Sequence, residues 1–88
     1  MSSGIERIAE AKDYILYGRG PCVAMVHGSS IGSSGYMTEK GIAYLVWRDG
    51  RPWLVSKGSE VAATAEQVQE IQKFSDDLKQ RIMAADER

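Results

Sequence analysis

The dipeptide Asp49-Gly50, set between two apolar runs, constrains the fold of this chain more than any other feature of its sequence. Both central residues of a type I′ turn need a positive φ, and Asp-Gly is one of the pairs that most readily supply it. The sequence therefore predicts a β-hairpin with strands at 42–47 and 52–56. A two-residue turn also fixes which residues of the two strands face each other.

The predicted register makes both faces of this hairpin apolar, because side chains alternate between the faces along each strand. One face carries Ile42, Tyr44, Val46, Trp53 and Val55. The other face carries Ala43, Leu45, Trp47, Pro52 and Leu54. A sheet with two apolar faces is normally covered on both sides. We therefore expect one face to meet a second subunit or a partner protein; the alternative is a monomer with helices on both faces.

The N-terminal segment carries the signals of a helix. Ser3 and Glu6 have the spacing of a capping box, and the apolar residues that follow fall on one helical face. The sequence predicts a helix from Ser3 to Tyr17 that ends at Gly18. The alternative interpretation makes residues 14–17 a strand that turns at 18–21 into the next one.

The C-terminal segment predicts a long helix. Thr64 and Gln67 form a second capping box, and no Gly or Pro interrupts the apolar stripe that follows. We expect a helix from Thr64 to about Ala85, with the last two turns after Leu78 extending beyond the sheet.

Between these helices, residues 22–26 are short, apolar and rich in β-formers, which predicts a strand. Residues 28–35 contain many glycines and serines, a composition typical of a flexible loop. The predicted fold is α+β, in a single small domain spanning 1–88. It has an N-terminal helix, a three-stranded, mainly antiparallel sheet containing the Asp49-Gly50 hairpin, and a long C-terminal helix.

The glycine- and serine-rich segment also contains Gly28-Ser29-Ser30-Ile31-Gly32, the pattern of a serine-hydrolase nucleophile elbow. The elbow needs a helix directly after it and a histidine downstream, whereas the single histidine, His27, comes before it. We therefore assign no catalytic residue, and Ser30 and His27 are the candidates that remain. The alternative function for this segment is a small-ligand or anion binder, or an enzyme, working at a dimer interface.

Candidate binding residues gather at the tip of the predicted hairpin and on the C-terminal helix. Arginine and tryptophan are enriched in binding hot spots, and two arginines face each other across the turn. The predicted binding residues are Trp47, Arg48, Arg51, Trp53 and Leu78.

Composition excludes several classes of protein. The 88 residues include 11 Lys and Arg against 12 Asp and Glu, a net charge of −1, which argues against nucleic-acid binding. One cysteine cannot form an internal disulfide, and one cysteine with one histidine does not make a zinc site, so we expect no metal or other cofactor. No apolar run is long enough to span a membrane, and the N-terminus lacks the features of a signal peptide.

These observations favour a small cytoplasmic interaction protein, an adaptor or inhibitor of bacterial or phage type. It would act through self-association or through a protein partner, with a small anionic ligand as the alternative. The hairpin, an apolar sheet face and the C-terminal helix are the expected contact surfaces.

Overall fold

The chain folds as a seven-stranded antiparallel sheet followed by one long helix. The computed structural model describes residues 4–86. Its elements are β1 (Glu6–Glu10), β2 (Ile15–Arg19), β3 (Cys22–His27), β4 (Ser30–Thr38), β5 (Gly41–Arg48), β6 (Arg51–Ser56), β7 (Ser59–Ala62) and α1 (Ala65–Asp86). Each strand pairs with the next one along the chain, so the sheet is a simple meander from β1 to β7.

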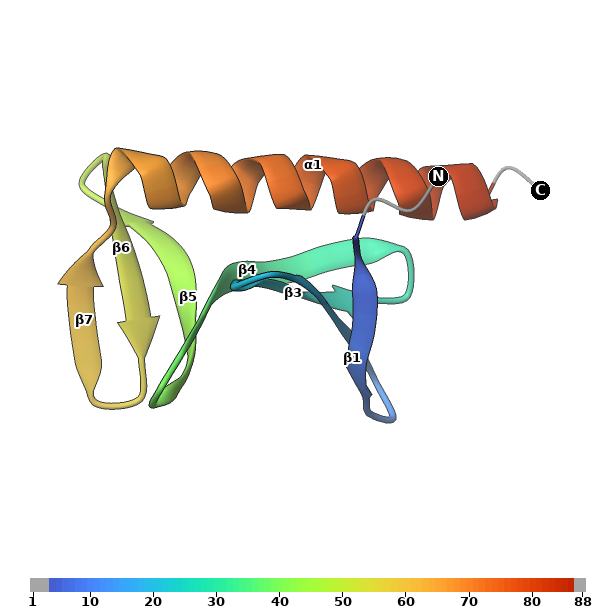
Figure 1. Ribbon diagram of the computed structural model, residues 1–88, viewed down its shortest axis with the longest axis horizontal. Helices are drawn as coiled ribbons and strands as arrows, with labels where there is room; N and C mark the ends of the chain where they lie inside the picture. The colour runs from blue at the N-terminus through green and yellow to red at the C-terminus, as the bar shows by residue number, and fades with distance from the viewer. Residues whose placement is uncertain (1–3, 87–88) are drawn as a thin grey trace.

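The sheet is strongly curved and α1 lies along one of its faces (Figure 1). Strands β3 and β4 cross beneath the helix, while β1 at one end and β5 to β7 at the other descend away from it. The result is an arch whose hollow side faces away from α1. The molecule measures 40 × 26 × 22 Å along its principal axes.

The predicted fold class is wrong: the structure has no N-terminal helix among its described residues, and the sheet has seven strands rather than three. Residues 6–19 form the β1–β2 hairpin, closed by a hydrogen bond from Ala11 N to Tyr14 O of 2.8 Å. The alternative interpretation, a strand near 14–17 that turns into the next one, is confirmed. Ser3, the predicted helix cap, lies outside the described residues. Pairing of β2 with β3 overrides the local helical pattern, since both strands are apolar and only a short turn separates them.

The prediction of a flexible loop at 28–35 is also wrong. Gly28 and Ser29 form a tight turn, with Gly28 at a φ of +64°, and β4 begins at Ser30. This strand lies between β3 and β5, so its backbone is paired on both sides. Those ladders outweigh the low strand propensity of glycine and serine. Strand β7 was not foreseen either, and β4 separates β3 from the hairpin strands.

The hairpin and the C-terminal helix are confirmed. Asp49 and Gly50 have φ values of +54° and +75°, as a type I′ turn requires, and the β5–β6 register pairs Val46 with Trp53. The capping box of α1 forms in both directions. Gln67 N donates to Thr64 Oγ1 at 3.1 Å, and Thr64 N donates to Gln67 Oε1 at 2.9 Å.

The core lies between α1 and the facing side of the sheet. The helix contributes Ile71, Phe74 and Leu78, which are almost wholly buried. The sheet contributes smaller side chains from β3, β5 and β6, among them Ala24, which lets the helix approach closely. Ile82 also packs against this core. We predicted that the helix extends beyond the sheet after Leu78. That prediction is wrong for the residues up to Ile82, because the sheet is wider than expected.

Polar contacts hold α1 on the sheet at three points. Arg19 Nη1 donates to Asp77 Oδ2 at 2.8 Å, and the Arg19 guanidinium lies 5.5 Å from the centre of the Phe74 ring. The Tyr36 hydroxyl donates to Glu70 Oε2 at 2.7 Å. Arg81 Nη1 donates to the carbonyl oxygen of Ile5 at 3.1 Å. The helix is thus fixed to β2, to β4 and to the residue that precedes β1.

Candidate functional site

The two catalytic candidates, His27 and Ser30, face each other across the β3–β4 turn. His27 Nδ1 lies 3.2 Å from the carbonyl oxygen of Asp13, and its ring lies 5.8 Å from that of Tyr14. The ring also sits close over Gly32, where an added Cβ would come within 2.9 Å of it. His27 thus contacts the β1–β2 turn and β4. No hydrogen bond joins His27 to Ser30 in the described structure. The geometry therefore does not support Ser30 as a nucleophile activated by His27.

The hairpin tip does not form one binding site. Trp47 pairs with Pro52 on the helix side of the sheet and is 55% exposed, whereas Trp53 pairs with Val46 on the opposite face. Arg48 faces Arg51 as predicted, and its guanidinium forms an ion pair of 2.6 Å with Glu60 on β7. That contact offsets the repulsion expected between the two arginines. The two tryptophan side chains therefore lie on opposite faces of the sheet and cannot belong to one binding site.

Leu78, the fifth predicted binding residue, belongs to the core. It is fully buried between α1 and the sheet, together with Ile71 and Phe74. It is therefore not accessible to a partner in the folded chain.

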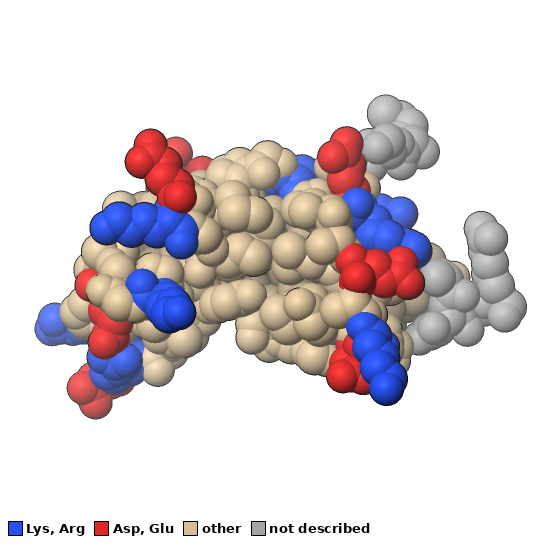
Figure 2. Space-filling view, turned by 90° about the horizontal axis from the view of Figure 1, so that it is seen from below, with Lys and Arg blue, Asp and Glu red and all other residues tan. Residues whose placement is uncertain are grey.

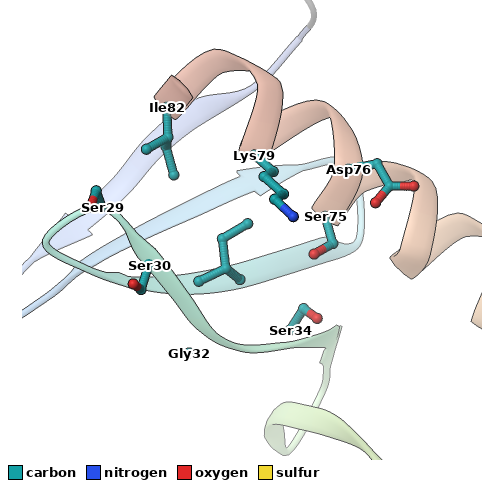
Figure 3. A pocket seen from close by; sticks show the side chains of 9 residues that line it. Ser29, Ser30, Gly32, Ser34, Ser75, Asp76, Lys79 and Ile82 are labelled. Atoms are coloured by element: carbon teal, nitrogen blue, oxygen red, sulfur yellow. The ribbon is translucent and has the colours of Figure 1, made fainter. Parts of the chain in front are cut away.

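An open pocket of about 490 Å³ lies between β4 and the C-terminal half of α1 (Figure 3). Strand β4 and the turn before it contribute Ser29, Ser30, Ile31, Gly32 and Ser34, and the helix contributes Ser75, Asp76, Lys79 and Ile82. The serine-rich segment singled out from the sequence thus lines a pocket. Its helix residues are more than forty positions away along the chain, so the sequence pattern gave no signal for them.

A second pocket, of about 370 Å³, opens beside the first turns of α1 and is mainly apolar. Leu54, Val61 and the Tyr36 side chain are among its lining residues. The hydrogen bond to Glu70 raises the pKa of Tyr36 to about 12, because the neutral phenol is the form that donates. The Tyr36 hydroxyl is therefore a poor general acid or base at neutral pH.

The remaining chemistry-bearing side chains are dispersed. Cys22 is buried against α1, and burial raises the pKa of its thiol, so it behaves as a small apolar residue as predicted. Within residues 4–86 no three His, Cys, Asp or Glu side chains gather as they would around a metal ion. No helix in the same range is long and apolar enough to cross a membrane.

The largest unexplained feature is the sheet face opposite α1, which we call the underside. The strand register places its apolar residues on one surface: Leu16, Val23, Met25, Met37, Ile42, Tyr44, Val46, Trp53 and Val55. No helix in the described part of the chain lies over it (Figure 1), although Leu16 and Val23 are buried within it. Seen from below, its middle is uncharged, most charged side chains lie around its two ends, and its outline is indented between them (Figure 2).

The centre of the underside is built around Val23. Gly18 on β2 and Gly35 on β4 flank it in the register, and Tyr44 follows on β5. Val23 is only 1% exposed although no helix lies over it. The side chain of Ile8 occupies the space above Gly18, and an added Cβ on Gly35 would overlap the carbonyl oxygen of Ala43. The absence of side chains at Gly18 and Gly35 thus lets the neighbouring strands pack closely around Val23.

Comparison with known proteins adds no further constraint: no protein-family model, curated protein sequence or solved structure matches this chain.

Proposed function

We propose that this chain is a protein-interaction domain and that the underside is its contact surface. The observation that carries the proposal is an apolar sheet face that is uncharged in its middle and that no helix covers (Figures 1 and 2). Met37 on this face is exposed and six more of its apolar side chains are only half-buried. Apolar surface of this kind often binds something. The hairpin face found in the sequence, which includes Tyr44, Val46 and Trp53, forms one flank of this surface.

We further propose that the occupant of the underside is a second copy of the chain. The two ends of the face carry opposite net charges. At the β1–β2 end, Glu6, Glu10 and Asp13 outnumber Arg7 and Lys12 by one; Arg19 of β2 is paired with Asp77 on the helix side. At the opposite end, Lys40, Arg48, Arg51 and Lys57 outnumber Glu39, Asp49 and Glu60 by one. A two-fold axis across the middle of the face brings unlike ends together in an isologous dimer.

The size of the face fits such a dimer. It extends over the 40 Å and 22 Å dimensions of the molecule. A standard interface buries roughly 800 Å² on each partner, so most of this face is needed to form one. A single, buried cysteine also fits the cytoplasmic location expected from the sequence.

Sedimentation velocity over a range of protein concentrations tests this proposal. The wild-type chain is expected to sediment as a dimer that dissociates on dilution. Met37→Glu places a charge on the underside at a side chain that is already 42% exposed, so it should give a folded monomer. Gln72→Glu makes the same charge change on the exposed surface of α1 and should leave the dimer intact.

Circular dichroism of each variant establishes that it is folded. A wild-type chain that remains monomeric at high concentration would overturn the proposal. So would equal weakening of the dimer by Met37→Glu and Gln72→Glu, since that would place the interface elsewhere.

A further inference from the structure

The pocket between β4 and α1 lies on the helix side of the sheet, away from the underside, and therefore raises a separate question. Three polar side chains, from the helix and from β4, line one side of it (Figure 3). Lys79 points from the helix into the pocket, Ser75 lies one turn before it, and Ser34 rises from β4. These residues come from two elements that only the tertiary fold brings together.

The ammonium group of Lys79 is not neutralised by a nearby carboxylate. No described side chain forms an ion pair with it. Asp76 lines the pocket, but its carboxylate points away from Lys79 (Figure 3). Asp77, the next residue, is engaged by Arg19. The part of the pocket nearest Lys79 therefore presents a positive charge beside hydroxyl groups, with the Asp76 carboxylate turned away, and this arrangement favours an anion.

Two apolar side chains also line the pocket. Ile31 and Ile82 pack against the core, next to the hydroxyl groups of Ser29 and Ser30. Ser34 is small, so β4 leaves room for the pocket where it passes beneath α1. Its volume of about 490 Å³ falls within the range of small-molecule sites and exceeds what a lone inorganic anion needs.

We propose that this pocket binds a small phosphomonoester. The Lys79 ammonium and the hydroxyls of Ser34 and Ser75 donate hydrogen bonds to the phosphate oxygens. A phosphate group offers more acceptor oxygens and more charge than a carboxylate, which suits several donors placed on two elements. The organic part of the ligand lies against Ile31 and Ile82.

Chemical-shift titration of the ¹⁵N-labelled full chain, first with inorganic phosphate and then with n-butyl phosphate, tests this inference. Both probes should give saturable shifts confined to β4 and the second half of α1. Butyl phosphate should bind several-fold more tightly than inorganic phosphate, because its alkyl chain buries apolar area against the two isoleucines. Acetate serves as the carboxylate probe and should bind more weakly than inorganic phosphate.

Variants identify the site. Lys79→Met keeps the aliphatic stem and should weaken phosphate binding roughly tenfold. Lys73→Met removes the same charge from α1 outside the pocket, so it should change binding less than about twofold. Ser75→Ala should weaken binding by about threefold, a smaller effect because it removes a neutral donor.

Equal losses from Lys79→Met and Lys73→Met would show diffuse electrostatic attraction and overturn the proposal. Acetate binding as tightly as phosphate, or butyl phosphate binding no more tightly than inorganic phosphate, would overturn the ligand class. The absence of saturable shifts would remove the site altogether. None of these outcomes affects the dimer proposal, which concerns the opposite face of the sheet.

Discussion

The two faces of the sheet are similarly apolar, yet they differ in what they contact. On the helix side, Phe74 and Leu78 are fully buried against the sheet, and polar contacts such as Arg19 to Asp77 hold α1 in place. On the underside, Trp53 and Tyr44 lie on a face that no helix in the described part of the chain covers. The comparison teaches that apolar residues on one sheet can have different roles. The helix side stabilises the monomer, and we propose that the underside stabilises an assembly.

The largest expected effect comes from disrupting the packing between α1 and the sheet. Phe74→Ala removes a fully buried aromatic ring between α1 and the sheet and should lower the free energy of unfolding by about 4 kcal/mol. That is a large share of the roughly 5–15 kcal/mol available to a small domain. Urea denaturation measures the loss. The neighbouring exposed variant Lys73→Ala should stay within about 0.5 kcal/mol of wild type; a comparable loss there would contradict the assigned packing.

The next effect tests the curvature that creates the hollow underside. Gly35→Ala places a Cβ against the carbonyl oxygen of Ala43 and should cost about 2–3 kcal/mol, because β4 and β5 must move apart. At Gly32 the nearest atoms belong to the exposed His27 ring, which can move, so Gly32→Ala should cost only about 0.5 kcal/mol. Thermal unfolding of both variants gives the comparison. Equal destabilisation would argue against a close approach specific to Gly35.

The two tryptophans sharpen the contrast between the faces. Trp53→Ala should weaken self-association about thirtyfold, because each of the two copies loses about 1 kcal/mol of contact energy and the dimer therefore loses about 2 kcal/mol. The same variant should lower monomer stability by only about 1–2 kcal/mol, because its side chain is half-buried. Trp47→Ala removes the same ring from the other face and should leave association unchanged. Sedimentation equilibrium of both variants measures their self-association. Weaker association of Trp47→Ala would contradict the proposal, because it would place the interface on the helix side of the sheet.

The smallest effect concerns one of the contacts that hold α1 in place. The hydrogen bond to Glu70 raises the pKa of Tyr36 to about 12, above the value of about 10 expected in the unfolded chain. Its stabilising contribution is therefore complete below pH 10 and is lost as the pH rises from 10 to 12. Tyr36→Phe should reduce stability at neutral pH and flatten the wild-type decline over that interval. Denaturation midpoints from pH 8 to 12 measure it, and parallel profiles for the two proteins would show that the bond is not formed.

The sequence predicted those elements whose signals are local. The Asp49-Gly50 turn determined the hairpin and its register, and the reciprocal contacts of Thr64 and Gln67 set the start of α1. Both features depend on residues within a few positions of one another. The two apolar hairpin faces were also predicted correctly, because alternation along a strand needs no tertiary information.

The errors arose where pairing between strands decides the structure. Residues 6–10 lie at a sheet edge with their side chains exposed, so their sequence carries no buried pattern to identify a strand. Gly35 appeared to be part of a flexible loop, although the structure needs a glycine there because two strands approach closely. Lys79 and Ser34 meet only in the folded chain, and neither residue was singled out as a candidate. Leu78 was assigned to a binding surface because the number of strands available to bury it was underestimated.

Hydroxyl-radical footprinting at increasing protein concentration tests the proposed role of the underside most directly. Met37 lies on the underside and Met83 on the exposed surface of α1, and the two side chains are 42% and 49% exposed in the single chain. Because the two side chains are similarly exposed in the single chain, the oxidation of Met83 serves as the reference for that of Met37. If the underside is the interface, Met37 should become protected from oxidation as the concentration rises while Met83 keeps its reactivity. Equal reactivity of Met37 and Met83 at every concentration would contradict the proposal that a second copy covers this face.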